Sequence, residues 1–184
     1  EDEGSKLTNL EMCALVGAVL GAGSDTAVDL HSYLIKNLLQ HPDQFTALKE
    51  NESLVQGAIS ETLRYESSGK TGLARYASED MEIQGHNIQK GQMVQLITST
   101  AGMDTSIYDN PDQFNIARSH DKSISFGQGP HYCIGVTLVR SQTEVMLKEL
   151  FKRFPKLSLG NEIVYDYDHH NARRMDVMTV NTNL

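Results

Sequence analysis

The chain has few of the residues that build disulfide scaffolds and zinc sites. Its 184 residues include two cysteines and no tryptophan. Cys13 and Cys133 lie far apart without Cys-x-x-Cys spacing, so they give no support to a disulfide framework or a zinc motif, although they exclude neither. The pair His169-His170 has no cysteine or acidic residue at a matching spacing and is predicted to lie on the surface.

Positive charge is also scarce. The 16 lysines and arginines are outnumbered by 24 aspartates and glutamates, which gives a formal net charge of −8 and an isoelectric point near 5.3. Because nucleic-acid binding needs a clustered basic surface, this balance argues against a nucleic-acid partner. The apolar fraction of 39% is ordinary for a globular protein and is enough for one domain with a core.

Long apolar segments are missing as well. The longest apolar run, from Met12 to Gly23, is about a dozen residues, whereas a helix that crosses a bilayer needs about 20. No secretory signal is present, and we expect a cytoplasmic protein. The sequence starts at Glu1 and not at Met, so an anchor or targeting segment ahead of it stays open.

One helix is predicted to be unusually long. The segment Thr8–Glu11 reads as a capping box, and apolar residues then recur at helical spacing as far as Leu38, before Pro42 stops the pattern. Such a helix would measure roughly 50 Å, whereas a compact chain of this size is about 40 Å across. The helix would therefore overhang its own domain. We expect residues 1–184 to be the C-terminal part of a larger protein.

The remaining pattern predicts a mainly α-helical protein with small β-sheets. The sequence contains no internal repeat and no low-complexity tract. Proline, glycine and changes of hydrophobic period divide the chain after the long helix. We expect two helices, a region of short strands, a long ordered loop, a further helix, and two or three short strands, at Pro42–Glu50, Ser53–Tyr65, Gly72–Thr98, Asp104–Ser125, Ile134–Phe154 and Lys156–Leu184.

The most informative segment is a glycine-rich loop that ends where a helical pattern begins. It reads Phe-Gly-Gln-Gly-Pro-His-Tyr-Cys-Ile-Gly over residues 126–135. A thiolate of Cys133 would lie near a helix N-terminus, where unpaired N–H groups and the helix dipole stabilise negative charge. The glycines leave room for the backbone to approach a large flat group, and His131 can reach an anionic group at its edge. A lone cysteine is more often buried and inert, but this context favours a ligand.

The long helix carries a second signal between Ala22 and Thr26. Asp25 and Thr26 are poor residues for a helix interior because their side chains compete for backbone hydrogen bonds. We expect the Thr26 hydroxyl to bind the Ala22 carbonyl, to open the helical hydrogen bonding, and to leave a groove for a small molecule or water. Three glycines that each cost about 1 kcal/mol in a helix indicate close contact with another helix or a flat cofactor: Gly17, Gly21 and Gly23.

The glycine-rich loop resembles the haem-ligand loop of the cytochrome P-450 superfamily at every signature position, and the resemblance covers nearly the whole chain. It implies that Cys133 is the proximal iron ligand of haem b. It also implies that Arg75 and His131 pair with the haem propionates. The cofactor-binding residues that the resemblance implies are Ala22, Gly23, Thr26, Arg75, Ser125, Phe126, Gly127, His131, Cys133, Ile134 and Gly135.

The resemblance assigns roles outside the loop too. The order Ala-Gly-x-Asp-Thr over residues 22–26 resembles the oxygen-binding groove of this family. There the threonine faces bound dioxygen and the acid serves proton delivery, so Asp25 and Thr26 are the implied catalytic residues. A Glu-x-x-Arg motif and a later arginine match the ion-pair triad that holds the family's fold without taking part in catalysis: Glu61, Arg64 and Arg118.

As a whole, the resemblance implies the cytochrome P-450 fold and a haem-thiolate monooxygenase. It also implies that residues 1–184 are the C-terminal part of a single haem-thiolate domain whose N-terminal half is absent. Such an enzyme inserts one atom of O2 into a small apolar substrate, with electrons from NAD(P)H delivered by a ferredoxin or flavin reductase. The reductase is expected on the cysteine side, near Lys122 and Arg140, and the substrate near residues 70–73 and 172–175. Two alternatives are a peroxide-using haem peroxygenase, against which the Asp25-Thr26 pair argues, and a haem-binding fragment without turnover.

Overall fold

The computed structural model describes residues 6–67, 69, 72–168 and 173–182. The expected surface pair His169-His170 and part of the two expected substrate-facing segments lie outside the described residues. The described chain is mainly helical, with small antiparallel sheets of two strands each, which confirms the expected fold class.

The long helix α1 spans Asn9–Gln40. It begins with the predicted capping box, because the Thr8 N–H donates to Glu11 Oε2 at 2.8 Å and the Glu11 N–H donates to Thr8 Oγ1 at 3.3 Å. It ends just ahead of Pro42, as predicted. The helix is continuous between these two signals.

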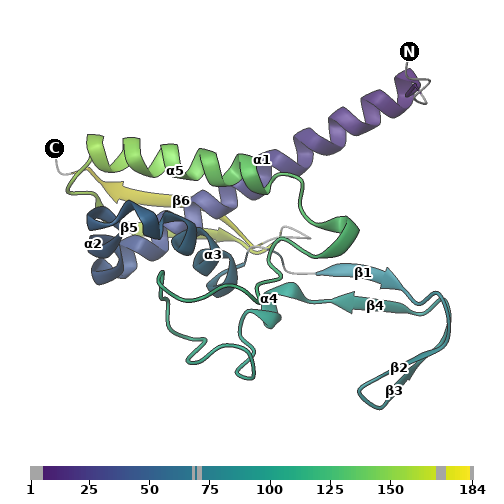
Figure 1. The fold of residues 1–184 in the computed structure, drawn as a ribbon. Helices are drawn as coiled ribbons and strands as arrows, with labels where there is room; N and C mark the ends of the chain where they lie inside the picture. The colour runs from purple at the N-terminus through teal and green to yellow at the C-terminus, as the bar shows by residue number, and fades with distance from the viewer. Residues whose placement is uncertain (1–5, 68, 70–71, 169–172, 183–184) are drawn as a thin grey trace.

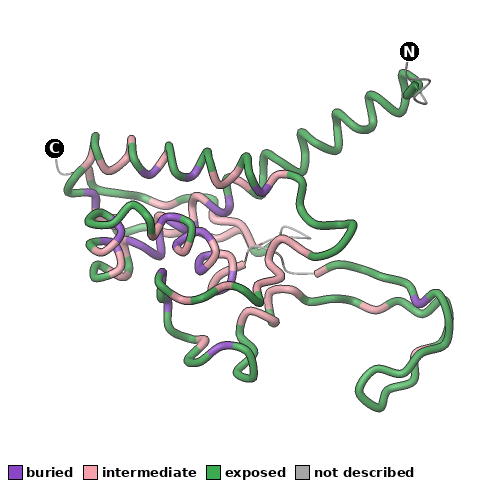
Figure 2. The backbone as a smooth tube through the Cα atoms, viewed as in Figure 1, coloured by how far each residue is buried: buried purple, intermediate pink, exposed green. Residues whose placement is uncertain are grey.

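The two halves of α1 have different surroundings. Leu30, Leu34 and Leu38 in the second half are buried in the core. In the first half, apolar side chains such as Leu15 and Val19 are exposed. Figures 1 and 2 show this first half projecting away from the other elements, as the predicted length of the helix requires.

Three short helical elements pack near the buried half of α1. They are α2 (Pro42–Glu50), the 3-10 helix η1 (Glu52–Leu54) and α3 (Val55–Tyr65). The helix expected from Ser53 therefore begins two residues later than predicted. The reason is local, because the Asn51 side chain accepts a hydrogen bond from the Ser53 N–H at 3.1 Å and separates a 3-10 turn from α3.

The hydrophobic core lies between these helices and the loop that crosses α3. The loop approaches so closely that a Cβ at Gly57 would be 2.1 Å from the carbonyl oxygen of Ile116. Glycine is thus required where the two backbones meet. The buried core consists of Leu30, Leu34, Leu38, Phe45, Leu48, Val55, Ala58, Ile59, Phe114, Ile116 and Leu147.

The sheets pair β1 with β4, β2 with β3, and β5 with β6, each antiparallel. The strands are β1 Leu73–Tyr76, β2 Met81–Ile83, β3 His86–Ile88, β4 Met93–Leu96, β5 Ser158–Asp166 and β6 Arg174–Asn181. The first four lie where short strands are predicted. The C-terminal region instead has two longer strands of nine and eight residues, which correct the expected two or three short ones. In Figure 1, β1–β4 extend as an arm, and the β5–β6 pair lies against α1.

A long loop connects the strand region to the last helix. It follows α4 (Thr98–Ala101) and contains one 3-10 turn, η2 (Gly129–His131), before α5 (Val136–Arg153) begins. α5 begins two residues after the expected Ile134, because Gly135 is its N-cap.

A buried cluster of charge fastens this loop to α3. Arg64 donates to both carboxylate oxygens of Glu61, at 2.8 Å from Nε and 2.7 Å from Nη2. Arg118 Nε lies 3.3 Å from Glu61 Oε1. The Nη1 of Arg64 donates to the carbonyls of Gly102 and Pro111 at 2.8 and 2.7 Å. Because the Glu61 side chain is fully buried, the pairing compensates a charge that water cannot reach.

α1 is also long and apolar enough to cross a membrane, judged by length and composition alone. Its most apolar window has a mean hydropathy of 1.3 and is 11% buried. The run Met12–Gly23 is too short to span a bilayer, but the whole helix is not. The core helix of a soluble protein passes the same test.

Candidate functional site

The loop before α5 is shaped by hydrogen bonds that turn its backbone toward the cysteine. The Cys133 N–H donates to the Phe126 carbonyl at 2.9 Å, and the Gly127 N–H donates to the Ile124 carbonyl at 2.8 Å. Gly127 and Gly129 have φ values of 74° and 65°, which residues with a side chain adopt only with strain. The sequence therefore has glycine where the chain must turn, and the turn brings Cys133 to the start of α5.

The thiol of Cys133 is free, and the residue is exposed. The alternative of a buried, inert cysteine therefore does not describe it. The neighbouring Ile134 is 96% exposed, an unfavourable state for a large apolar side chain. The thiol and the isoleucine side chain are thus both accessible to a bound group.

The cysteine loop and the Ala22–Thr26 segment lie at the same end of a helix pair. α1 and α5 are joined by a hydrogen bond of 2.9 Å between His31 Nε2 and Thr143 Oγ1, and they run in the same direction in Figure 1. From this contact, Thr26 lies about 8 Å back along α1, and the start of α5 about 10 Å back along α5, at 1.5 Å per residue. The two segments that the sequence singles out thus lie on the same side of this contact.

Thr26 makes the hydrogen bond that its position predicts. Its Oγ1 donates to the Ala22 carbonyl at 2.6 Å. The expected opening of the helix is wrong, because α1 continues through this point. A carbonyl oxygen has two lone pairs, so it can accept the hydroxyl while it keeps its place in the helix.

Asp25 has a partner that sequence reasoning missed. Its Oδ1 lies 3.4 Å from Nη2 of Arg174, the first residue of β6, and Nε of the same arginine lies 3.7 Å from Oδ1 of Asp29. Asp29 is buried, whereas the Asp25 side chain is 61% exposed. One guanidinium therefore bridges two carboxylates a helical turn apart. On the sequence, Arg174, within residues 172–175, is expected to face the substrate, and its contact with Asp25 is not predicted.

A second cluster holds β6 in this position. Glu66, at the end of α3, pairs with Lys36 of α1 and accepts a hydrogen bond from Arg173 Nη2 at 2.9 Å. The Tyr33 hydroxyl donates to the Arg173 carbonyl at 2.9 Å, and burial raises the pKa of this phenol. Because Arg173 precedes Arg174, the cluster fixes the arginine that reaches Asp25. No sequence signal joins these residues, since they come from three separate elements.

Arg75 and His131, the expected propionate partners, are both exposed. Arg75 lies on β1, and its Nη1 donates to the neighbouring Ala74 carbonyl at 2.8 Å. Neither side chain has a carboxylate partner in the described part of the chain. Both are therefore available to an anionic group. Ser125 and Phe126 are partly buried beside the loop.

The residues at this site fit a haem held by a thiolate. A Cβ at Gly21 or Gly23 would meet nothing within 4 Å, so this part of α1 is open to a flat group. Among the described residues, no group of three or more His, Cys, Asp or Glu could hold a metal ion. A metal at Cys133 would thus need a ligand that brings its own donors, as a porphyrin does.

Comparison with known proteins identifies the family. The sequence model of the family Cytochrome P450 matches residues 1–162. The chain belongs to the cytochrome P450 family, whose members hold haem through a cysteine thiolate.

Individual relatives agree with this. The chain is 36% identical over 180 residues to an epothilone C/D epoxidase of Sorangium cellulosum, covering 98% of this chain and 43% of the relative. It is 41% identical over 159 residues to a biotin biosynthesis cytochrome P450 of Bacillus subtilis (strain 168), covering 86% of this chain and 40% of the relative. The chain thus spans about two fifths of the length of these relatives.

Solved structures confirm the expected fold. The crystal structure of epothilone D-bound cytochrome P450epoK superposes with a TM-score of 0.90 at 36% identity, covering 98% of this chain and 44% of that chain. The structure of P450BioI in complex with an acyl carrier protein ligated to hexadec-9Z-enoic acid gives a TM-score of 0.90 at 39% identity, covering 97% of this chain and 46% of that chain.

Proposed function

We propose that the protein is a haem-thiolate monooxygenase and that residues 1–184 carry the cysteine side of its haem site. The observation that supports this most strongly is the position of Cys133. Its thiol is exposed at the start of α5, at the end of the α1–α5 pair where Ala22–Thr26 also lies. Relatives named as epoxidases, hydroxylases and monooxygenases support the same class of reaction.

The chain supplies the contacts that would hold haem b. Cys133 would ligate the iron, while Arg75 and His131 would bind the propionates, since a guanidinium suits a carboxylate well. The glycines of the loop and of α1 would admit the porphyrin, with Ala22, Gly23, Ser125, Phe126 and Ile134 against it. When bound, the haem supplies the oxidising chemistry and the site for O2, and the thiolate favours O–O cleavage.

Asp25 and Thr26 would control proton delivery. Thr26 is held by its bond to the Ala22 carbonyl, which fixes the direction of its hydroxyl oxygen. Asp25 is largely exposed, so it can exchange protons with solvent, and Arg174 restrains its carboxylate. The pair thus connects water to the helix face that would lie over the haem. Its presence supports O2 as oxidant in preference to peroxide.

Electrons and substrate come from partners. We propose that NAD(P)H supplies electrons through a ferredoxin or flavin reductase on the cysteine side, where Lys122 is exposed. The substrate would be a small apolar molecule that meets the remaining part of the domain as well as this chain. The named relatives come from bacteria, which supports a cytoplasmic location.

The carbon monoxide spectrum of the reduced, haem-loaded protein tests the central assignment. A thiolate ligand moves the Soret band far to the red, and Cys133→Ser should abolish that species. Cys13→Ser is the matched control, because Cys13 is the other free, exposed cysteine and lies on α1 away from the loop. An unchanged spectrum in Cys133→Ser, or the same loss in Cys13→Ser, would refute the assignment.

A further inference from the structure

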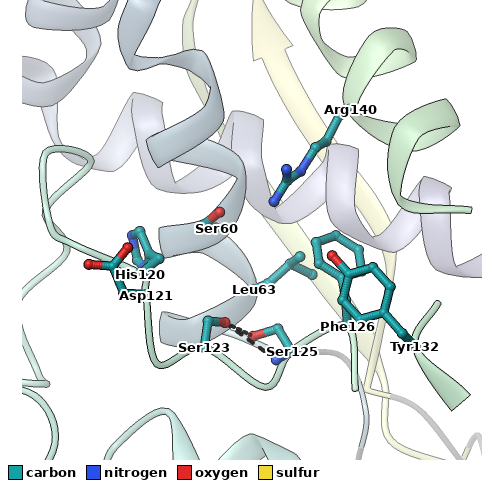
Figure 3. A pocket seen from close by; sticks show the side chains of 9 residues that line it. All are labelled: Ser60, Leu63, His120, Asp121, Ser123, Ser125, Phe126, Tyr132 and Arg140. Carbon is teal, nitrogen blue, oxygen red and sulfur yellow. Dashed lines mark hydrogen bonds between the residues drawn. The ribbon is translucent and has the colours of Figure 1, made fainter. Parts of the chain in front are cut away.

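We propose that a pocket behind the cysteine loop binds a small oxyanion such as phosphate or a short carboxylate. The pocket has a volume of about 290 Å³. It lies between α3, the loop before the cysteine and the first turns of α5, as Figure 3 shows. Its lining is Ser60 and Leu63 of α3, His120, Asp121, Ser123, Ser125, Phe126 and Tyr132 of the loop, and Arg140 of α5.

Arg140 is the cation in this lining, which also contains the acid Asp121. Its guanidinium lies over the ring of Phe126, with Cζ 5.7 Å from the ring centroid, and points into the pocket in Figure 3. The Nε atom is buried and has no hydrogen-bond partner. Within the described residues, Arg140 forms no ion pair with any carboxylate. A half-buried cation with an unused donor favours an anion as its partner.

His120 supplies a second set of unused donors or acceptors. Its side chain is 10% exposed, and neither ring nitrogen has a hydrogen-bond partner. The nearest acid is Glu61, whose Oε2 lies 3.5 Å from Nε2 and already accepts from Arg64. A buried imidazole whose two nitrogens form no hydrogen bond is costly unless a ligand or water completes it.

The rest of the lining sets the kind of ligand. Ser60, Ser123 and Ser125 present hydroxyls, and Ser123 Oγ donates to Ser125 Oγ at 3.2 Å, the hydrogen bond that is dashed in Figure 3. The acid in the lining, Asp121, is exposed and accepts a hydrogen bond from Ser119 Oγ at 2.7 Å, which occupies one of its oxygens. Hydroxyls, an imidazole and one guanidinium suit the several acceptor oxygens of a compact anion.

The pocket adjoins the proposed haem contacts and shares Ser125 and Phe126 with them. Phe126 lies between the cysteine and the pocket. Its carbonyl accepts a hydrogen bond from the Cys133 N–H, and its ring contacts the guanidinium of Arg140. A bound anion would therefore lie behind the cysteine loop and not over the iron. Anion binding can be measured without turnover, so the anion proposal can fail while the monooxygenase proposal stands.

Isothermal titration calorimetry on the oxidised, haem-loaded protein tests the proposal with inorganic phosphate and, separately, with acetate. We expect saturable binding of at least one of them at a ratio of one per chain. Comparison of the two affinities shows whether the pocket prefers phosphate or a short carboxylate. Arg140→Gln should weaken binding about tenfold or more, since hydrogen bonds to a charged group contribute about 1.5–3 kcal/mol.

Two further variants keep the outcome decisive. Arg153→Gln removes the same charge from the exposed end of α5 and should leave affinity within about twofold, as expected for a distant surface charge. Ser60→Leu fills the pocket while every charge stays in place, and should abolish binding even if Arg140→Gln does not fold. Absence of saturable binding in the parent protein would overturn the proposal. So would equal affinity in the parent and in Ser60→Leu.

Discussion

The charge cluster at Glu61 and the loop at Cys133 differ in how far their bonding capacity is used. Glu61 is fully buried, and Arg64 and Arg118 both bind its carboxylate. Cys133 is exposed, and its sulfur is free. Both are parts of one arrangement, since the arginines hold the loop that continues into the cysteine segment. Structural residues have their partners within the chain, whereas the proposed functional residue leaves its ligand position open.

The two halves of α1 also differ in whether their side chains have partners within the chain. Its second half buries leucines in the core, whereas its first half exposes apolar residues and glycines around Asp25 and Thr26. One continuous helix thus joins a region that determines stability to a region available for a cofactor. Substitutions in the buried region should change stability, whereas substitutions in the exposed region should change cofactor binding or activity.

The largest effect on stability is expected for Arg64→Ala. It leaves the buried Glu61 carboxylate with too few partners and frees the loop carbonyls, which should cost about 3–5 kcal/mol in the free energy of unfolding. The matched control is Arg153→Ala, which breaks the exposed pair with Glu149 on α5 and should cost about 0–1 kcal/mol. Urea unfolding of the haem-loaded protein, followed by circular dichroism, measures both. Similar losses in the two variants would contradict the assigned role of burial.

A pair of glycine substitutions tests packing in both regions. Gly57→Ala puts a Cβ 2.1 Å from the Ile116 carbonyl oxygen and should destabilise by about 1–3 kcal/mol, because the two backbones must separate. Gly21→Ala meets nothing within 4 Å and should favour the helix by about 1 kcal/mol.

The Gly21 variant also examines the proposed haem face. If the porphyrin lies against α1 there, the added methyl group should lower haem affinity or shift the Soret band without loss of fold. An unaltered spectrum and affinity would show that this part of α1 does not touch the haem.

Thr26→Ala should alter chemistry and not stability. Thr26 is exposed, and alanine is the better helix former by about 0.6 kcal/mol, so the fold should remain intact. We expect the normal carbon monoxide spectrum, with a larger share of electrons diverted to peroxide or water. Product formed per electron consumed is the measurement. Unchanged coupling would place proton delivery elsewhere and would favour the peroxide-using alternative.

Arg174→Gln should have a smaller effect of the same kind. The guanidinium lies 3.4 Å from the exposed Asp25 and 3.7 Å from the buried Asp29, so its loss should also lower the free energy of unfolding, by about 1–3 kcal/mol. Because it restrains the Asp25 carboxylate, coupling should fall less than in Thr26→Ala. Arg174→Lys keeps the charge and should recover part of the loss. If coupling falls equally in Arg174→Gln and Arg174→Lys, the charge of residue 174 does not hold the Asp25 carboxylate in place.

The smallest effect concerns pH. Burial lowers the pKa of both His31 and His120 below the usual value of 6.5. Both therefore bind their proton less tightly in the folded than in the unfolded chain, so the unfolded chain binds more protons as the pH falls through about 6.5. Stability should fall as pH drops from 7 through 6.5 and flatten once the folded pKa values are passed.

His31→Gln should reduce this slope, because His31 is half-buried and its ring contacts Thr143. For His120, the charges of Glu61, Arg64, Arg118 and Asp121 act in both directions. Thermal unfolding between pH 5 and 8 in a buffer without phosphate measures the slope. A steeper slope in His31→Gln would contradict the assignment.

Local sequence signals predicted much of this fold. The capping box and Pro42 set both ends of α1, and the spacing of Glu61 and Arg64 places them on one face of α3. The glycines of the loop predicted a turn that ends at the cysteine. Each of these signals acts within a few residues, which is why the sequence alone reveals it.

Contacts between distant segments could not be predicted in this way. Arg174 and Asp25 are 149 residues apart, and the pocket behind the loop needs α3, the loop and α5 together. The start of α3 was misplaced because the Asn51 side chain forms a separate turn. Only the packed chain shows which of these groups meet.

The guanidinium groups at Glu61 bind the loop in a way that bears on how its sequence can drift. Arg64 donates to the carbonyls of Gly102, Pro111 and Gln113, and Arg118 donates to three main-chain carbonyls between residues 109 and 113. Every residue type has such a carbonyl. Most side chains of the loop can therefore mutate without loss of these anchors, whereas neither arginine can. Substitutions should accumulate around the two fixed cations, and the loop can adapt its surface to new partners while its path stays the same.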